Sequence, residues 1–169
     1  MPHDIPLPPT LHWWPLPTPL TPAALAAALP RTPPTPVPCR RCLRDIAPGD
    51  RALLLSYDPF PTASDGSPYR GPTAIFVHDL ASKDNTCELA DVKRDFGGCV
   101  PEQQVARLMA VRAFDKGGML REAEVAEGKD LVMACERLLS EGQEADERVE
   151  YLHLHYAAHG CFAVRVDRG

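Results

Sequence analysis

The chain has 169 residues and a formal net charge of −5 at pH 7. This length is enough for one domain with a hydrophobic core and too short for two ordinary domains. The acidic balance argues against a general affinity for nucleic acid or for an anionic membrane, because both need a basic surface on the protein. We therefore expect a small-molecule substrate as the partner, with no nucleic acid and no membrane, and leave a homodimer open.

Two further features of the composition bear on the compartment. No apolar run approaches the roughly 18 residues of a membrane span, and residues 1–10 have neither the basic start nor the apolar core of a secretion signal. We expect a cytoplasmic protein. Its six cysteines are then expected to be mostly free thiols in a reducing compartment.

The first 37 residues are expected to form a proline-rich arm. Thirteen of the nineteen prolines lie within residues 1–38, which excludes long regular elements. One short helix is predicted over residues 21–29, with Thr21 as its cap and Pro22 at its first position. Disorder is an alternative for this composition. The apolar Trp13, Trp14 and Leu16 favour instead an extended arm that packs on the domain at residues 38–169.

After the arm the sequence predicts short strands and two further helical segments. A helix start is predicted at residues 101–107 and an amphipathic helix at residues 128–140. The predicted strands cover residues 51–57, 74–78, 108–114, 119–127, 150–156 and 161–166. The last two are separated by a four-residue connection that contains Gly160, which is typical of a hairpin. The expected fold class is α+β: a single domain with a mostly antiparallel sheet of about five or six strands and two or three helices.

The strand predicted at residues 150–156 carries two histidines two positions apart. Side chains alternate across a strand, so His153 and His155 are predicted on one face, with Leu152, Leu154 and Tyr156 on the other. Histidine titrates near neutral pH and binds metals, so the pair favours acid–base chemistry or a metal site. The alternative is an exposed sheet face without a function.

In this order of elements the chain resembles the bacterial and fungal domain-of-unknown-function family numbered 1203. The resemblance covers roughly residues 38–167, and its blocks are Pro38-Cys39-Arg40-Arg41-Cys42-Leu43, Pro48-Gly49-Asp50, Leu53-Leu54-Leu55-Ser56-Tyr57, Ser67-Pro68-Tyr69-Arg70, Ile75-Phe76-Val77-His78, Arg112-Ala113-Phe114-Asp115 with Gly118-Met119, and Tyr151-Leu152-His153-Leu154-His155 with Gly160-Cys161. The resemblance implies no function. The chain departs from the family pattern in its proline-rich start and in a longer insert at residues 81–98.

A general acid–base site is the first candidate for chemistry. The expected catalytic residues lie on or at the ends of predicted strands and are His153, His155, Arg112, Tyr57 and His78. The expected substrate-binding residues are Arg70, Tyr69, Asp115, Tyr151 and Cys161. A neutral imidazole can remove a proton near pH 7, while an arginine or a tyrosine hydroxyl stabilises the enolate or phenolate oxygen. Each residue also has an ordinary structural role open to it, such as a salt bridge for Arg112 or a turn position for His78.

A metal site is the second candidate. It would use His153 and His155 with His78, Asp115 or His159 as a third ligand. No recognised ligand spacing supports the third position, so no metal and no cofactor is expected.

A third candidate is the Cys39-x-x-Cys42 motif. The other cysteines, at positions 87, 99, 135 and 161, are widely scattered, which argues against a structural site of four thiolates. The sequence after the motif is too short for the helix that a thioredoxin-like centre needs. A redox-sensitive or anion-binding edge remains open because Arg40, Arg41 and Arg44 lie close by.

Together these patterns predict a cofactor-independent isomerase or cyclase that acts on a small phenolic or polyketide-like metabolite by histidine acid–base catalysis. Ring closure of a phenol onto an enone is an example. One alternative is a non-catalytic module that binds a small ligand or a metal, or a metal-dependent enzyme that uses the histidine pair. Another is a partner-binding protein whose proline-rich arm is the recognition element.

Overall fold

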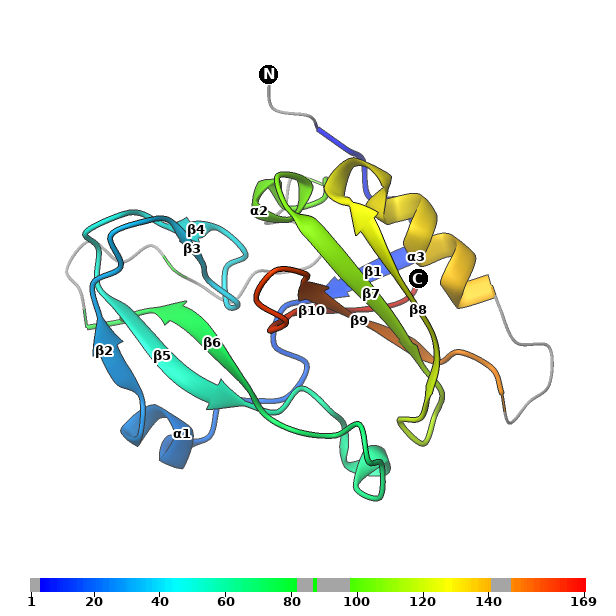
Figure 1. The fold of residues 1–169 in the computed structure, drawn as a ribbon, viewed down its shortest axis with the longest axis horizontal. Coiled ribbons are helices and arrows are strands. Elements are labelled where there is room, and N and C mark those ends of the chain that lie inside the picture. The colour runs from blue at the N-terminus through cyan, green and yellow to red at the C-terminus, as the bar shows by residue number, and fades with distance from the viewer. Residues whose placement is uncertain (1–3, 82–86, 88–97, 141–146) are drawn as a thin grey trace.

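Two antiparallel sheets, one of five strands and one of three, are the framework of the computed structural model (Figure 1). The structure describes residues 4–81, 87, 98–140 and 147–169. The larger sheet has the strand order β1-β10-β9-β7-β8. Its strands are β1 (Leu11–Trp14), β10 (Phe162–Arg168), β9 (Tyr151–Tyr156), β7 (Leu108–Phe114) and β8 (Leu120–Glu127).

The smaller sheet has the order β2-β5-β6 and lies beside one end of the larger one (Figure 1). Its strands are β2 (Leu29–Arg31), β5 (Ala52–Tyr57) and β6 (Thr73–His78). A two-stranded ribbon of β3 (Val37–Pro38) and β4 (Asp45–Ile46) adjoins it. The polar loop between β5 and β6 contains a short 3₁₀ turn, Thr62–Ser64.

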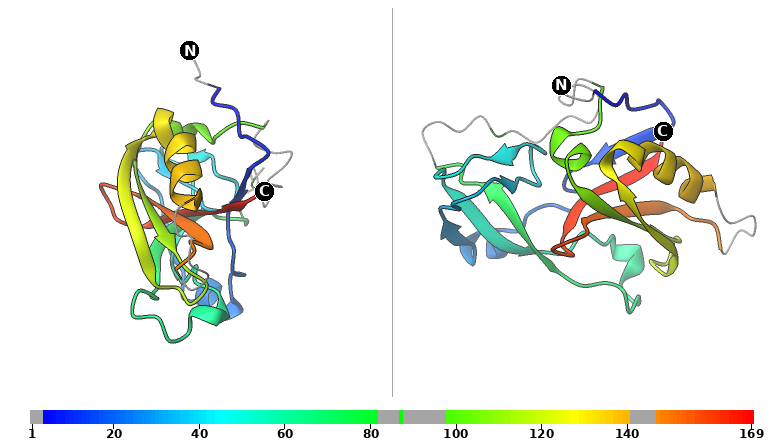
Figure 2. Two further views of the ribbon diagram at one scale, coloured as in Figure 1. Left: turned by 90° about the vertical axis from the view of Figure 1, so that its right-hand side faces the viewer. Right: turned by 45° about the horizontal axis from the view of Figure 1, so that its top comes forward.

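One long helix covers the larger sheet on one face. Helix α3 (Leu131–Ser140), entered through the 3₁₀ turn Gly128–Asp130, lies across the strands on that face (Figure 2). Its buried Leu131 and Leu138 share a core with Leu152 and Leu154 of β9. Helices α1 (Pro22–Ala26) and α2 (Glu102–Val105) are each about one turn long. In the described part of the chain no helix is both long and apolar enough to cross a membrane.

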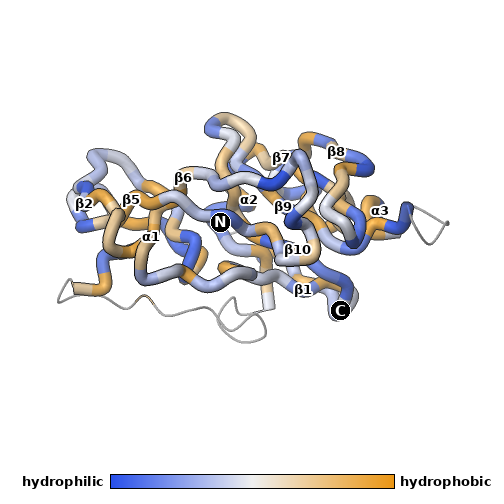
Figure 3. The backbone as a smooth tube through the Cα atoms, turned by 90° about the horizontal axis from the view of Figure 1, so that it is seen from below, coloured by the Kyte–Doolittle hydropathy of each residue, from blue (hydrophilic) through white to orange (hydrophobic). Residues whose placement is uncertain are grey.

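The fold class predicted from the sequence is confirmed. The described residues form an α+β domain, mostly antiparallel, with a five-stranded main sheet and three helices. Figure 3 shows the local basis of the smaller sheet, where most of β5 consists of hydrophobic residues. Of the insert expected at residues 81–98, only residues 81, 87 and 98 lie within the described part of the chain.

The predicted N-terminal helix is too long at its C-terminal end. Thr21 caps it as expected, because its hydroxyl accepts a hydrogen bond from the Ala24 amide at 3.0 Å. The helix nevertheless ends at Ala26, and Leu29 begins strand β2. Pro30 explains this difference, since the residue before a proline is pushed out of the helical region and into an extended conformation.

The arm packs on the domain through a strand, which the proline content did not indicate. Strand β1 pairs with β10, so Trp13 lies opposite Val166. Trp13 is fully buried, and its indole Nε1 donates a hydrogen bond to Gln104 Oε1 at 2.8 Å. Trp14, also expected to pack on the domain, contributes less than predicted, because the next side chain on a strand points to the opposite face and Trp14 is 44% exposed.

Candidate functional site

The register of β7 and β9 places both predicted histidines on one face of the larger sheet. Arg112 lies opposite His153, and Ala110 lies opposite His155. Leu152, Leu154 and Tyr156 face the other way, into the core beneath α3. The alternation read from the sequence therefore describes this strand correctly. The two imidazoles nevertheless occupy different environments.

His153 is enclosed by aromatic rings. Its ring centroid lies 4.8 to 5.3 Å from the centroids of four of them, belonging to Phe60, Phe114, Tyr151 and Phe162. The side chain is fully buried, and neither ring nitrogen has a hydrogen-bond partner among the described residues. Burial lowers the pKa of His153 well below its ordinary value. His153 is therefore neutral at pH 7 and is walled off from solvent.

His155 is also buried, but it has a hydrogen-bond partner. Its Nδ1 lies 2.9 Å from the carbonyl oxygen of Gly160 in the hairpin turn. Because a carbonyl can only accept, Nδ1 carries the proton in the neutral ring and Nε2 is left as the basic nitrogen. Burial lowers the pKa of His155 to about 4, against the opposing effect of the Gly160 hydrogen bond.

A cavity of about 350 Å³ lies on this side of the sheet and includes His155 in its wall. The other side chains that define its chemistry are Arg112, Phe60, Tyr69, Phe114 and Leu120. Arg112 is half-buried, and no hydrogen bond or ion pair joins its guanidinium to another group within the described residues. A cation that lines an aromatic cavity and has no partner in the described part of the chain can bind an anionic or acidic oxygen.

Two tyrosines predicted in the site use their hydroxyls elsewhere. Tyr57 Oη donates to the Thr18 carbonyl oxygen at 2.7 Å and accepts from the Thr18 amide at 2.9 Å. Tyr151 Oη lies 3.2 Å from the Ser64 hydroxyl. Both side chains are buried, and neither lines the cavity. Tyr57 fastens the N-terminal arm to β5, and Tyr151 fastens the loop before β6 to β9.

Among the predicted substrate-binding residues, only Tyr69 lines the cavity, and it is 47% exposed. Arg70 Nε binds Asp58 Oδ2 at 2.8 Å. Asp115 accepts hydrogen bonds from the Gly117 and Met119 amides and pairs with Arg121, contacts that stabilise the turn between β7 and β8. Burial raises the pKa of the Asp115 carboxyl, but these donors outweigh that effect and hold it below its ordinary value.

Cys161 lies at the hairpin turn and accepts a hydrogen bond from Arg40 Nη2 at 2.8 Å. Arg40 is buried, donates also to the Phe162 and Pro38 carbonyl oxygens, and lies over the ring of Tyr156. This arginine joins the turn after β3 to the β9–β10 hairpin. It is fully engaged in these structural contacts.

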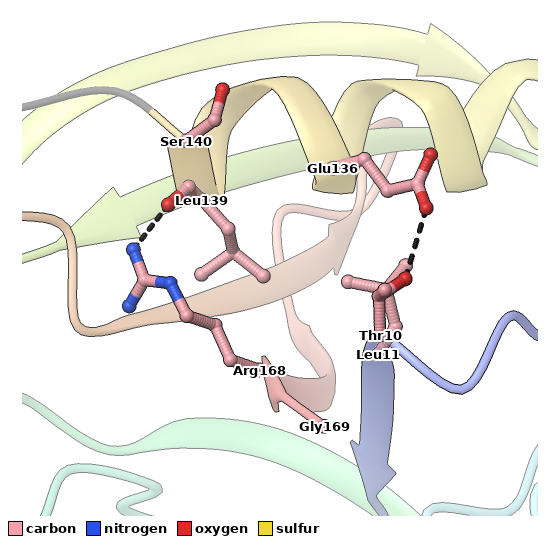
Figure 4. A pocket seen from close by; sticks show the side chains of 7 residues that line it. All are labelled: Thr10, Leu11, Glu136, Leu139, Ser140, Arg168 and Gly169. Carbon is pink, nitrogen blue, oxygen red and sulfur yellow. Dashed lines mark hydrogen bonds between the residues drawn. The ribbon is translucent and has the colours of Figure 1, made fainter.

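A second hollow lies between the end of β10 and α3 (Figure 4). Thr10 donates to Glu136 across it at 3.0 Å, and Arg168 donates to the Leu139 carbonyl at the C-terminal end of the helix. A cation at a helix C-terminus complements the helix dipole. The polar groups here already serve the packing of α3, so this hollow offers less to a ligand than the cavity at Arg112.

His78 lies away from the cavity, in a group of four potential metal ligands. These are Cys39, Cys42, His78 and Cys87, whose ligand atoms all lie within 4.8 Å of one another. Cys39 Sγ is 3.6 Å from Cys87 Sγ, and Cys42 Sγ is 3.6 Å from His78 Nδ1. In the residues that the structure describes, this is the one group of three or more such ligands, so His153, His155 and His159 do not assemble a metal site there.

The spacing of the cysteines alone does not reveal this group, because one of its four members is a histidine. The signal that could have found it is His78-x₈-Cys87, a histidine at the end of a predicted strand with a cysteine nine positions later. The topology explains the assembly. Strand β6 runs beside the turn after β3, where Cys39 forms a parallel bridge with Phe76, two residues before His78.

The ionisation of the group is shared among its members. Burial raises the pKa of the Cys39 thiol, but hydrogen bonds from Cys42, Cys87 and His78 outweigh burial and lower it. Hydrogen bonds to Cys39 and Cys42 raise the pKa of His78 to about 10. The arrangement thus favours a thiolate at Cys39, the form in which a cysteine binds metals.

The family assignment follows from comparison with known sequences. The sequence model of the family described as "Protein of unknown function (DUF1203)" matches residues 36–168. The chain belongs to this family. No curated protein and no solved structure matches it. The family match begins just before the Cys39-x-x-Cys42 motif and includes every side chain that lines the cavity and all four potential metal ligands.

Proposed function

We propose that this protein binds a small, planar molecule with an acidic oxygen, such as a phenol, an enol or an aromatic carboxylic acid, in the cavity at Arg112. The observation that carries the proposal is the half-buried guanidinium of Arg112, which has no partner among the described residues and lines an aromatic cavity. Arginine binds carboxylate and phenolate oxygens through charge-assisted hydrogen bonds.

The size and walls of the cavity support a ligand of one or two rings. A volume of about 350 Å³ lies at the small end of the range typical of ligand sites. Phe60, Tyr69 and Phe114 offer ring faces and edges on which a planar ligand can stack. The centroids of Phe60 and Phe114 lie 5.1 Å apart at an interplanar angle of 80°, so a ligand meets one ring by its face and the other by its edge.

A second candidate is the isomerase or cyclase predicted from the sequence, and the tautomer of His155 favours it. With Nδ1 bound to Gly160, Nε2 is free to take the proton of a phenol. The phenolate oxygen then adds to the β-carbon of an enone within the same molecule, and Arg112 stabilises the enolate oxygen. Return of the proton from Nε2 to the α-carbon completes an isomerisation that needs no co-reactant. Bound negative charge would raise the low pKa of His155 toward neutrality.

Binding and turnover can be tested separately. A panel of phenols and aromatic acids is titrated into the wild type and into Arg112→Leu, with Arg107→Leu as the matched control because Arg107 already pairs with Asp45 at 2.8 Å. We expect Arg112→Leu to lose binding and Arg107→Leu to keep it. Compounds with an enone beside the phenol are then followed for ring closure, which depends on His155 if the second candidate holds.

A further inference from the structure

We propose that Cys39, Cys42, His78 and Cys87 bind one structural zinc ion. The set of three cysteines and one histidine is a standard structural zinc set. It combines two cysteines of the turn after β3 with His78, the last residue of β6, and with Cys87. The proposal is independent of the ligand proposed for the cavity.

Two of the six separations between ligand atoms match the edges of a tetrahedral zinc site, and all six lie within 4.8 Å. With Zn–S near 2.3 Å and Zn–N near 2.0 Å, the edges of the tetrahedron are about 3.8 Å between two sulfurs and about 3.5 Å between sulfur and nitrogen. The corresponding separations are 3.6 Å between Cys39 Sγ and Cys87 Sγ and 3.6 Å between Cys42 Sγ and His78 Nδ1. A disulfide would instead hold two sulfurs at about 2.05 Å.

The surroundings support thiolate ligands. Cys39, Cys42 and Cys87 are all buried, and the His78 amide donates to Cys39 Sγ at 3.4 Å, as expected for a metal-bound thiolate. The turn that presents the first two cysteines is closed by the Leu43 amide, which donates to the Cys39 carbonyl at 3.1 Å. Leu43 adopts φ = 56°, a conformation that a non-glycine residue keeps only when its surroundings enforce it.

The position of the group indicates a structural role. Three of its members belong to the small core beneath β5 and β6, together with Ile46 and Ile75. A core of this size is marginal alone, and a metal that ties three segments together supplies folding energy. Four protein ligands close the coordination sphere. His78 lies five residues along β6 from Thr73, which lines the cavity, so these two residues are about 17 Å apart along the strand.

Metal analysis of the full chain tests the proposal. The protein is purified under reducing conditions without chelator, any affinity tag is removed, and zinc and iron are measured by plasma mass spectrometry. We expect about one zinc per chain, and cobalt substitution should give thiolate-to-cobalt charge transfer with the intense d–d bands of a tetrahedral site. Four results would overturn the proposal: metal-free protein that also binds no cobalt after reduction, a Cys39–Cys42 disulfide in the intact mass, iron in place of zinc, or the cobalt spectrum of a six-coordinate site.

Variants identify the ligands. Cys42→Ser and His78→Ala should lose the zinc, whereas Cys99→Ser, outside the group, should retain it. His78→Cys should still bind one metal ion, and its cobalt spectrum should shift to that of a site with four thiolates. This variant retains four ligands, so the test does not rely on a variant that loses the metal. Zinc retained in both Cys42→Ser and His78→Ala, or an unchanged cobalt spectrum in His78→Cys, would contradict this ligand set.

Discussion

Lowering the pH from 7 to 5 is expected to destabilise the protein through its two buried histidines. Burial lowers the pKa of His155 to about 4, whereas an unfolded chain binds the proton at about pH 6.5. The unfolded state therefore gains a proton that the folded state does not, and the free energy of unfolding falls as the pH drops through 6.5 toward 4. The stabilising effect is fully present above about pH 7.

The size of the effect follows from the two pKa values. Each pH unit over which only the unfolded histidine is protonated costs about 1.4 kcal/mol, so His155 contributes a loss of about 2 kcal/mol between pH 7 and pH 5. His153, whose pKa burial lowers as well, adds a loss of the same sign. This interval lies above the range in which ordinary carboxyl groups titrate.

Urea unfolding followed by tryptophan fluorescence measures the loss, because Trp13 is buried in the folded state. The double variant His153→Leu/His155→Gln should lose markedly less stability than the wild type over the same interval. His159→Gln is the control, since His159 is exposed in the hairpin turn. The four potential metal ligands are present in every variant, so their contribution cancels in the comparison. Equal losses in the wild type and the double variant would refute the assignment of buried, neutral histidines.

Three further predictions concern single residues. In urea titrations, Trp13→Ala should lower the free energy of unfolding by about 3–5 kcal/mol and Trp14→Ala by less than about 1 kcal/mol, because Trp13 is buried and Trp14 is exposed. Similar losses in the two variants would contradict the packing of β1. Gly118→Ala should lower stability more than Gly160→Ala, because both glycines have positive φ but a Cβ at Gly118 would lie 2.5 Å from Ser64 Oγ. A smaller loss for Gly118→Ala would contradict the close approach of Ser64 to this turn. On a verified substrate, His155→Ala should lower turnover by about 10²- to 10⁴-fold with a native circular dichroism spectrum, and unchanged turnover would exclude it as the base.

Strands β5 to β10 were predictable because each carries a local pattern, whereas the shorter strands β1 to β4 were not predicted. The alternation around His153 and His155 predicted correctly which side chains of β9 face α3. The apolar run of β5 indicated a strand without any knowledge of the strands that pair with it. Trp14 shows the limit of such reasoning. Its hydrophobicity is visible in the sequence, but its exposure depends on the register of β1 against β10, a long-range pairing.

The site was less predictable than the fold, since its residues come from separate strands. Like Arg112, both His78 and Tyr57 were predicted near the end of a strand. The structure nevertheless places Tyr57 on Thr18 and His78 beside three cysteines. Whether a side chain at a strand end faces a cavity depends on how the neighbouring loops pack, and no local sequence pattern indicates that packing.

The proposed function depends above all on Arg112 as the anchor for an acidic oxygen. Saturation-transfer NMR with a panel of phenols and aromatic carboxylic acids, each paired with its methyl ether or methyl ester, measures this role. We predict that several acidic members bind the wild type, that their methylated partners do not, and that Arg112→Leu abolishes the difference. Equal binding of acids and their methylated partners, with no effect of Arg112→Leu, would contradict the role of Arg112 as the anchor.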